Sequence, residues 1–155
     1  MEYLLTSVLI IVLLVLAWID FKTFLLPDFL TIPLMFLGLI SIGLGWLNWT
    51  NFTSSILGVL AGWGSLYLLN ILYRYFKGID GIGMGDAKLL AALGAFLGWE
   101  SLPFILLIAS CTGLIGGAIW LKVHRQDSSH VFPFGPFIAL GGIITVLWQI
   151  LQPTI

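Results

Sequence analysis

The sequence predicts an all-α membrane protein with about six transmembrane helices. Of its 155 residues, 60% are hydrophobic and only 8% are charged, whereas soluble domains carry about 25% charged residues. So few charges cannot cover a water-exposed surface. Uncharged stretches recur along the chain, and a helix needs about 20 such residues to cross a bilayer core of about 30 Å. Barrel strands are excluded, because they would alternate polar and apolar residues.

Six apolar stretches are the expected helices. They cover residues 3–19, 29–49, 54–73, 89–99, 101–121 and 132–150. The first stretch lacks a positively charged start and a small-residue cleavage site, so we expect a retained helix rather than a signal peptide. The fourth stretch is short and spans only if the charged residues before it lie near the membrane edge. The length suits one membrane-embedded domain, residues 1–155.

The basic residues predict how the helices are oriented. With six helices, all of them fall in the first, third and fifth loops or just beside these loops: Lys22, Arg74, Lys77, Lys88, Lys122 and Arg125. The positive-inside rule makes this side cytoplasmic and places both termini outside. A five-helix count would break this segregation. The net charge of −1 offers no basic field for nucleic acid.

Asp20 is the first candidate functional residue. It follows an apolar run, and the first helix should continue at least a turn beyond it before Pro27 ends helical geometry. Asp20 is therefore expected inside a membrane helix, where an acid is costly and often functional. The alternatives are an interfacial charge or an ion pair with Lys22 or Lys88.

Asp86 is the second candidate. It follows Gly81, Gly83 and Gly85, and three glycines in five residues permit close approach of another backbone. An extended substrate segment is one such partner. A simple helix N-cap is an alternative for Asp86. A phosphate-binding loop is a weaker one, because an acid ends the loop in place of a lysine and a hydroxyl.

Together the two acids indicate aspartic protease chemistry. One carboxylate acts as a base on water while a protonated partner polarises the amide carbonyl. Two rival classes stay open: a small transporter or channel that moves protons or cations, and an anchor subunit whose acids only pair with Lys22 and Lys88. No metal or cofactor is expected, because the chain has one cysteine and its histidines, His124 and His130, lie in one loop.

Four ordered motifs resemble a known family. They are Ala-Trp-Ile-Asp-Phe-Lys at 17–22, Leu-Leu-Pro-Asp at 25–28, Gly-Met-Gly-Asp-Ala-Lys-Leu-Leu at 83–90 and Pro-Phe-Gly-Pro at 133–136. The set is similar to the bacterial type 4 prepilin peptidases, which are GxGD-type membrane aspartyl proteases. The resemblance extends over essentially the whole chain. A GxGD motif alone would be weak, but four motifs in the family's order are specific.

The resemblance implies cleavage of the basic leader of type IV prepilins or type II secretion pseudopilins, at the cytoplasmic face of the bacterial inner membrane. It implies that Asp20 and Asp86 are catalytic. Asp28 is expected to support the structure or orient the basic leader, and Gly83, Gly85 and Lys88 to bind substrate or support the site. Many members also carry a tetracysteine zinc loop and N-methylate the product with S-adenosylmethionine. This sequence lacks those cysteines, so the resemblance supports the peptidase and not the methyltransferase.

Overall fold

The computed structural model of the protein describes residues 1–78, 83–124 and 133–151. Within these ranges the chain is helical and contains no strand, which confirms the predicted all-α fold with six helices. The helices are α1 (Glu2–Thr23), α2 (Asp28–Gly43), α3 (Phe52–Lys77), α4 (Met84–Leu97), the short 3-10 helix η1 (Trp99–Ser101), α5 (Leu102–His124) and α6 (Gly135–Leu151).

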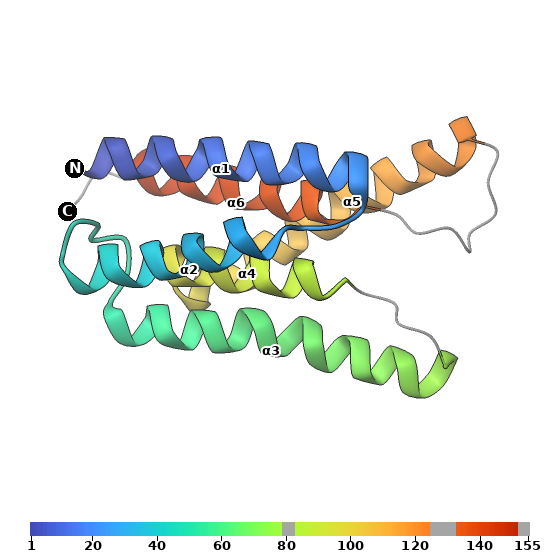
Figure 1. Ribbon diagram of the computed structural model, residues 1–155, viewed down its shortest axis with the longest axis horizontal. Helices are drawn as coiled ribbons and strands as arrows, with labels where there is room; N and C mark the ends of the chain where they lie inside the picture. Colours follow the sequence, from blue (N-terminus) through green and yellow to red (C-terminus); the bar gives the residue numbers. More distant parts are fainter. Residues whose placement is uncertain (79–82, 125–132, 152–155) are drawn as a thin grey trace.

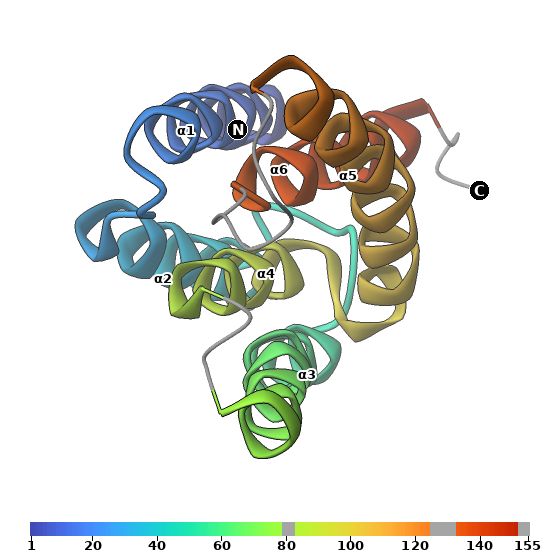
Figure 2. The ribbon, with the colours of Figure 1, turned by 90° about the vertical axis from the view of Figure 1, so that its right-hand side faces the viewer.

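The helices pack as two groups of three. In one group α4 lies between α2 and α3, and in the other α6 lies between α1 and α5. Figure 2 shows this arrangement along the bundle, and contacts between α4 and α6 join the two groups. Helices α1 and α6 are therefore neighbours, and α4 contacts α6 at the seam between the groups.

Helix lengths agree with a multi-pass membrane protein. Three segments are long and apolar enough to span a bilayer: Glu2–Thr23, Phe52–Lys77 and Trp99–Ile119. Helices α2 and α6 are apolar but shorter, with 16 and 17 residues. Large apolar side chains cover much of the outer surface, as lipid contact requires.

Helix α4 is the buried centre of its group. It has 14 residues, of which eleven are buried, and a helix that is apolar on all sides belongs inside a protein. The predicted fourth stretch, 89–99, was misplaced by five residues at its start. The helix begins at Met84, because Gly83 in an extended conformation starts it, and it ends at Leu97, because Gly98 adopts a positive φ of 78°. Asp86 therefore lies within the helix.

Glycines bring α3 and α4 into backbone contact. A Cβ atom added at Gly58 would overlap the backbone of Gly94, and one added at Gly62 would lie 2.8 Å from the carbonyl oxygen of Leu90. The Ser55 hydroxyl donates a hydrogen bond of 2.8 Å to the carbonyl oxygen of Ala95 across the same contact. Close approach at small residues is the usual way in which membrane helices pack.

One end of the bundle collects the basic residues. The basic residues within the described ranges lie at the ends of α1, α3 and α5 or near the start of α4: Lys22, Arg74, Lys77, Lys88 and Lys122. These helix ends share one end of the bundle, and α1 begins and α6 finishes at the other (Figure 1). Arg125 lies outside the described residues. That the basic end faces the cytoplasm stays a prediction.

Candidate active site

Asp20 points into the bundle because of its position on α1. The buried residues of this helix follow a stripe with steps of three and four, and Asp20 continues the series Leu9, Leu13, Leu16. Its side chain is only 4% exposed. The backbone N–H of Gly135, the first residue of α6, donates a hydrogen bond of 3.1 Å to Asp20 Oδ2. The first and last helices therefore meet at this carboxyl group.

The end of α1 lies just beyond Asp20. The helix stops at Thr23, where Phe24 takes a left-handed conformation (φ 56°) and donates its N–H to the Asp20 carbonyl oxygen at 2.8 Å. This is an αL helix end, and it turns the chain back across the end of the bundle. The prediction that α1 passes Asp20 by about a turn and stops before Pro27 is confirmed.

Asp86 lies in the first turn of α4. Gly83 is the N-cap and Asp86 is the third helical residue, so the interpretation of Asp86 as the N-cap is wrong. The side chain is 8% exposed, and its Oδ2 would be 3.5 Å from a Cβ atom added at Gly83. The carboxyl group is therefore folded toward the start of its own helix. Gly81 lies outside the described residues.

Asp20 and Asp86 lie on the two helix groups, near enough for their charges to interact. Leu26, from the turn between α1 and α2, packs against a neighbour of each. A Cβ atom added at Gly85 would lie 2.7 Å from Leu26 Cβ, and one added at Gly135 would lie 3.2 Å from Leu26 Cδ1. One apolar side chain thus touches the neighbours of both acids.

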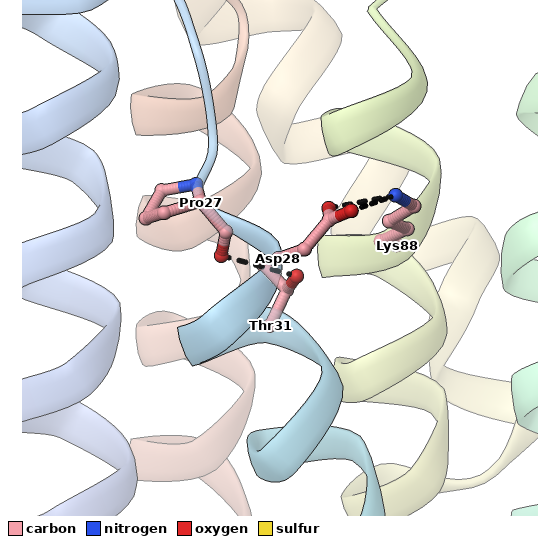
Figure 3. Close-up of polar contacts among 4 residues, drawn as sticks. All are labelled: Pro27, Asp28, Thr31 and Lys88. Atoms are coloured by element: carbon pink, nitrogen blue, oxygen red, sulfur yellow. Dashed lines mark hydrogen bonds and ion pairs between the residues drawn. The ribbon is translucent and has the colours of Figure 1, made fainter.

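The nearby lysines have other partners. Lys88 Nζ lies 2.6 and 2.7 Å from the two carboxylate oxygens of Asp28 (Figure 3). Lys22 Nζ lies 4.5 Å from the ring centroid of Trp18. Among the described residues, neither lysine forms an ion pair with Asp20 or Asp86, so the ion-pair interpretation of these acids is wrong for both lysines.

Gly83 and Gly85 differ in what surrounds them. Gly85 has no space for a side chain because Leu26 occupies it, whereas at Gly83 a Cβ atom would make only an ordinary contact with Asp86. The absence of a Cβ at Gly85 therefore accommodates Leu26, a residue of this chain.

This difference gives a matched prediction. Gly85→Ala should displace Leu26 or the first turn of α4 and lower activity about tenfold or more, because small shifts of reacting groups are costly. Gly83→Ala should stay within about threefold of wild type, because the φ of −65° at Gly83 suits alanine. Activity on a candidate substrate, measured on folded protein in detergent, checks both. Equal losses in the two variants would contradict the steric explanation.

The described residues hold no cluster suited to a metal ion. No group of three or more His, Cys, Asp or Glu side chains gathers in this part of the chain. The side chains of His124 and His130 lie outside the described part. The site built by Asp20 and Asp86 is therefore a pair of carboxyl groups on two helices, which suits acid–base chemistry.

Comparison with known proteins identifies the family. The model of the type IV leader peptidase family matches residues 7–118. The chain belongs to the type IV leader peptidase family. It is 41% identical over 140 residues to a prepilin leader peptidase/N-methyltransferase of Pectobacterium carotovorum. It is 42% and 40% identical to proteins with the same name from Burkholderia pseudomallei and Pseudomonas aeruginosa, each over 136 residues.

The chain spans about half the length of these relatives. The alignments cover 90%, 88% and 88% of this chain but 50%, 43% and 46% of the respective relatives. Comparison with solved structures found no match. Membership of the type IV leader peptidase family agrees with the resemblance that the four motifs predict.

The structure adds two residues that sequence reasoning missed. Leu26 and Gly135 each lie in one of the four motifs, but only the fold brings them beside Asp20 and Gly85. The sequence signal for both residues was that each lies in one of the four family motifs. These motifs are far apart in the chain but converge at one end of the bundle.

Proposed function

We propose that this chain is a single membrane-embedded aspartic endopeptidase domain that removes the leader of type IV prepilins or type II secretion pseudopilins. Asp20 and Asp86 are the proposed catalytic pair. The observation that supports this most is their arrangement: two buried carboxyl groups from different helices lie near each other, and the nearby Lys88 pairs with Asp28 instead. Family membership supports the same activity.

The proposed reaction needs one proton shared between the two groups. The ionised carboxylate removes a proton from a water molecule, and the oxygen attacks the scissile carbonyl carbon while the protonated partner donates to the carbonyl oxygen. The tetrahedral intermediate then breaks its C–N bond, and a proton passes to the leaving amine. The two groups titrate as a coupled pair, so we assign the proton to the pair.

The location of the pair supports this function over the rival classes. Both acids lie at the basic end of the bundle, where a short basic leader and anionic lipid headgroups are expected to gather. A transporter would need polar groups along a pathway, whereas both acids sit near one end. We propose that this end faces the cytoplasm and that the membrane is the bacterial inner membrane.

Leader cleavage during co-expression tests the proposal. The chain and a candidate prepilin are produced together in cells that lack their own prepilin peptidase, and leader removal is followed by gel shift. We expect a shift to the mature length only when the chain is present, and mass spectrometry of the new N-terminus should locate one cleaved bond. Absence of cleavage across several prepilins and pseudopilins, with both proteins verified in the membrane, would refute the proposed activity.

A further inference from the structure

The turn between α1 and α2 contacts both sides of the candidate site. We call its residues Leu26, Pro27 and Asp28 the clasp segment. It follows the αL turn at Phe24, and α2 begins within it at Asp28. Pro27 fixes the entry to α2, and its carbonyl oxygen accepts hydrogen bonds from the backbone N–H and the hydroxyl of Thr31, at 3.2 and 3.4 Å (Figure 3). The segment is therefore held in a defined path.

Leu26 is the inner contact of the clasp segment. It is 9% exposed, whereas the neighbouring Leu25 is 72% exposed. Its side chain packs against Gly85, one residue before Asp86, and against Gly135, whose N–H is bonded to Asp20. Neither glycine has room for a Cβ atom on that side. Leu26 thus lies between Gly85, which precedes Asp86, and Gly135, whose N–H is bonded to Asp20.

Asp28 is the outer contact of the clasp segment. Both of its carboxylate oxygens lie within 2.7 Å of Lys88 Nζ, and Lys88 is two residues after Asp86 on α4. The side chains of Lys88 and Asp28 are 32% and 57% exposed. Ion pairs this exposed contribute little to folding stability. Their removal should therefore affect the position of α4 more than the survival of the fold.

We propose that the clasp segment sets the position of Asp86 relative to Asp20, with Leu26, Asp28 and Lys88 as positioning residues. This inference rests on the proposed function. It differs from a role of Asp28 in binding the basic leader, because both oxygens of Asp28 are engaged by Lys88. Leu26 against Gly85 and Asp28 against Lys88 contact the same face at the start of α4, because positions three apart in a helix share a face. Together the two contacts restrain how far this part of α4 can shift, and misplacing a reacting group by about 1 Å can cost about 100-fold in rate.

A double-mutant cycle tests the outer contact. Asp28→Asn and Lys88→Met are made singly and together, and kcat and KM are measured on purified protein with a prepilin peptide. Each single change should lower kcat about two- to fivefold with KM unchanged, because an exposed ion pair adds only a weak restraint on position. The double variant should lose no more than the worse single variant, because the two residues act through one contact.

Two results would overturn the role of the pair. Losses that multiply in the double variant would mean that Asp28 and Lys88 act independently. A rise in KM confined to Asp28→Asn, present for a basic leader and absent for an uncharged leader, would mean that Asp28 binds the leader.

A leucine comparison tests the inner contact. Leu26→Ala should lower kcat about tenfold or more, Leu26→Met should keep most of the activity because it conserves volume, and the exposed Leu25→Ala should match wild type. Equal activity of Leu26→Ala and Leu25→Ala would overturn the role of Leu26.

An activity-free measurement separates this inference from the proposed function. Hydrogen exchange of residues 86–90, whose N–H groups are bonded within α4, should speed up about two- to fivefold in Asp28→Asn and about tenfold or more in Leu26→Ala, since both changes release the start of the helix. Unchanged exchange would overturn the clasp even if wild type cleaves prepilin. Faster exchange in a protein that cleaves no prepilin would support the clasp as a restraint on α4 and refute the proposed function alone.

Discussion

Asp20→Asn and Asp86→Asn should each slow prepilin cleavage about 10²- to 10⁴-fold, which is the range that general acid–base groups contribute. Asparagine keeps the size of the side chain but can neither take a proton from water nor give one to the leaving group. Because the two carboxyl groups work as a unit, the double variant should be no worse than the worse single variant. Single-turnover cleavage of a prepilin peptide by purified protein measures these losses.

A matched control separates chemistry from folding. Glu100 lies in η1, which follows the end of α4 opposite to Asp86, and its carboxylate accepts a hydrogen bond from Ser54. Glu100→Gln keeps an acceptor there and should cleave within about threefold of wild type. Substantial activity in either aspartate variant, with melting behaviour like that of wild type, would show that the pair is wrongly assigned.

Gly58→Ala should destabilise the bundle strongly, although alanine favours helices over glycine by about 1 kcal/mol. The new Cβ would overlap the backbone of Gly94, and backbone cannot move aside as a flexible side chain does. Overpacking of a dense interior typically costs about 1–3 kcal/mol. Because α4 carries Asp86, the same change should also lower cleavage. Thermal unfolding in detergent, followed by tryptophan fluorescence, measures the first effect.

Gly64 provides the control on the same helix. A Cβ atom at Gly64 would meet nothing within 4 Å. Gly64→Ala should therefore leave the unfolding temperature unchanged or raise it, through the gain in helix propensity. Equal unfolding temperatures for Gly58→Ala and Gly64→Ala would contradict the close backbone contact between α3 and α4.

The helices and the inward direction of Asp20 were predictable from local pattern. Apolar stretches locate helices because lipid admits little else. The spacing from Leu9 through Leu13 and Leu16 to Asp20 already puts the acid on the same face as the leucines. Hydropathy was a poor guide at the start of α4, where the charges at Asp86 and Lys88 hid the first turn, and at the end of α2, which stops at Gly43 although the apolar stretch runs on to residue 49. Asp86 is tolerated in α4 because the protein buries it, and Lys88 because it pairs with Asp28.

The contacts of the site could not be predicted from local pattern. The Gly135 N–H is bonded to Asp20, which lies 115 positions earlier in the sequence. Lys88 pairs with Asp28, although Asp86 is only two residues away in the sequence. The first contact depends on the packing of α6 against α1. The second depends on how the αL turn at Phe24 directs the chain into α2, and a left-handed phenylalanine has no sequence signature. The site residues taken from the motif resemblance stay a prediction, and tertiary packing decided which residues of the motifs touch.

Helix α4 has consequences for how the protein is made. Its 14 residues extend about 21 Å at about 1.5 Å per residue, short of a bilayer core of about 30 Å, and it carries an acid and a lysine. Such a segment is a poor candidate for insertion alone. Its two main neighbours, α2 and α3, precede it in the chain, so a receiving surface already exists when α4 leaves the ribosome. Gly135 emerges afterwards, so the hydrogen bond to Asp20 forms only after α5 and the start of α6 have been made, and a nascent chain that stops before Gly135 lacks it.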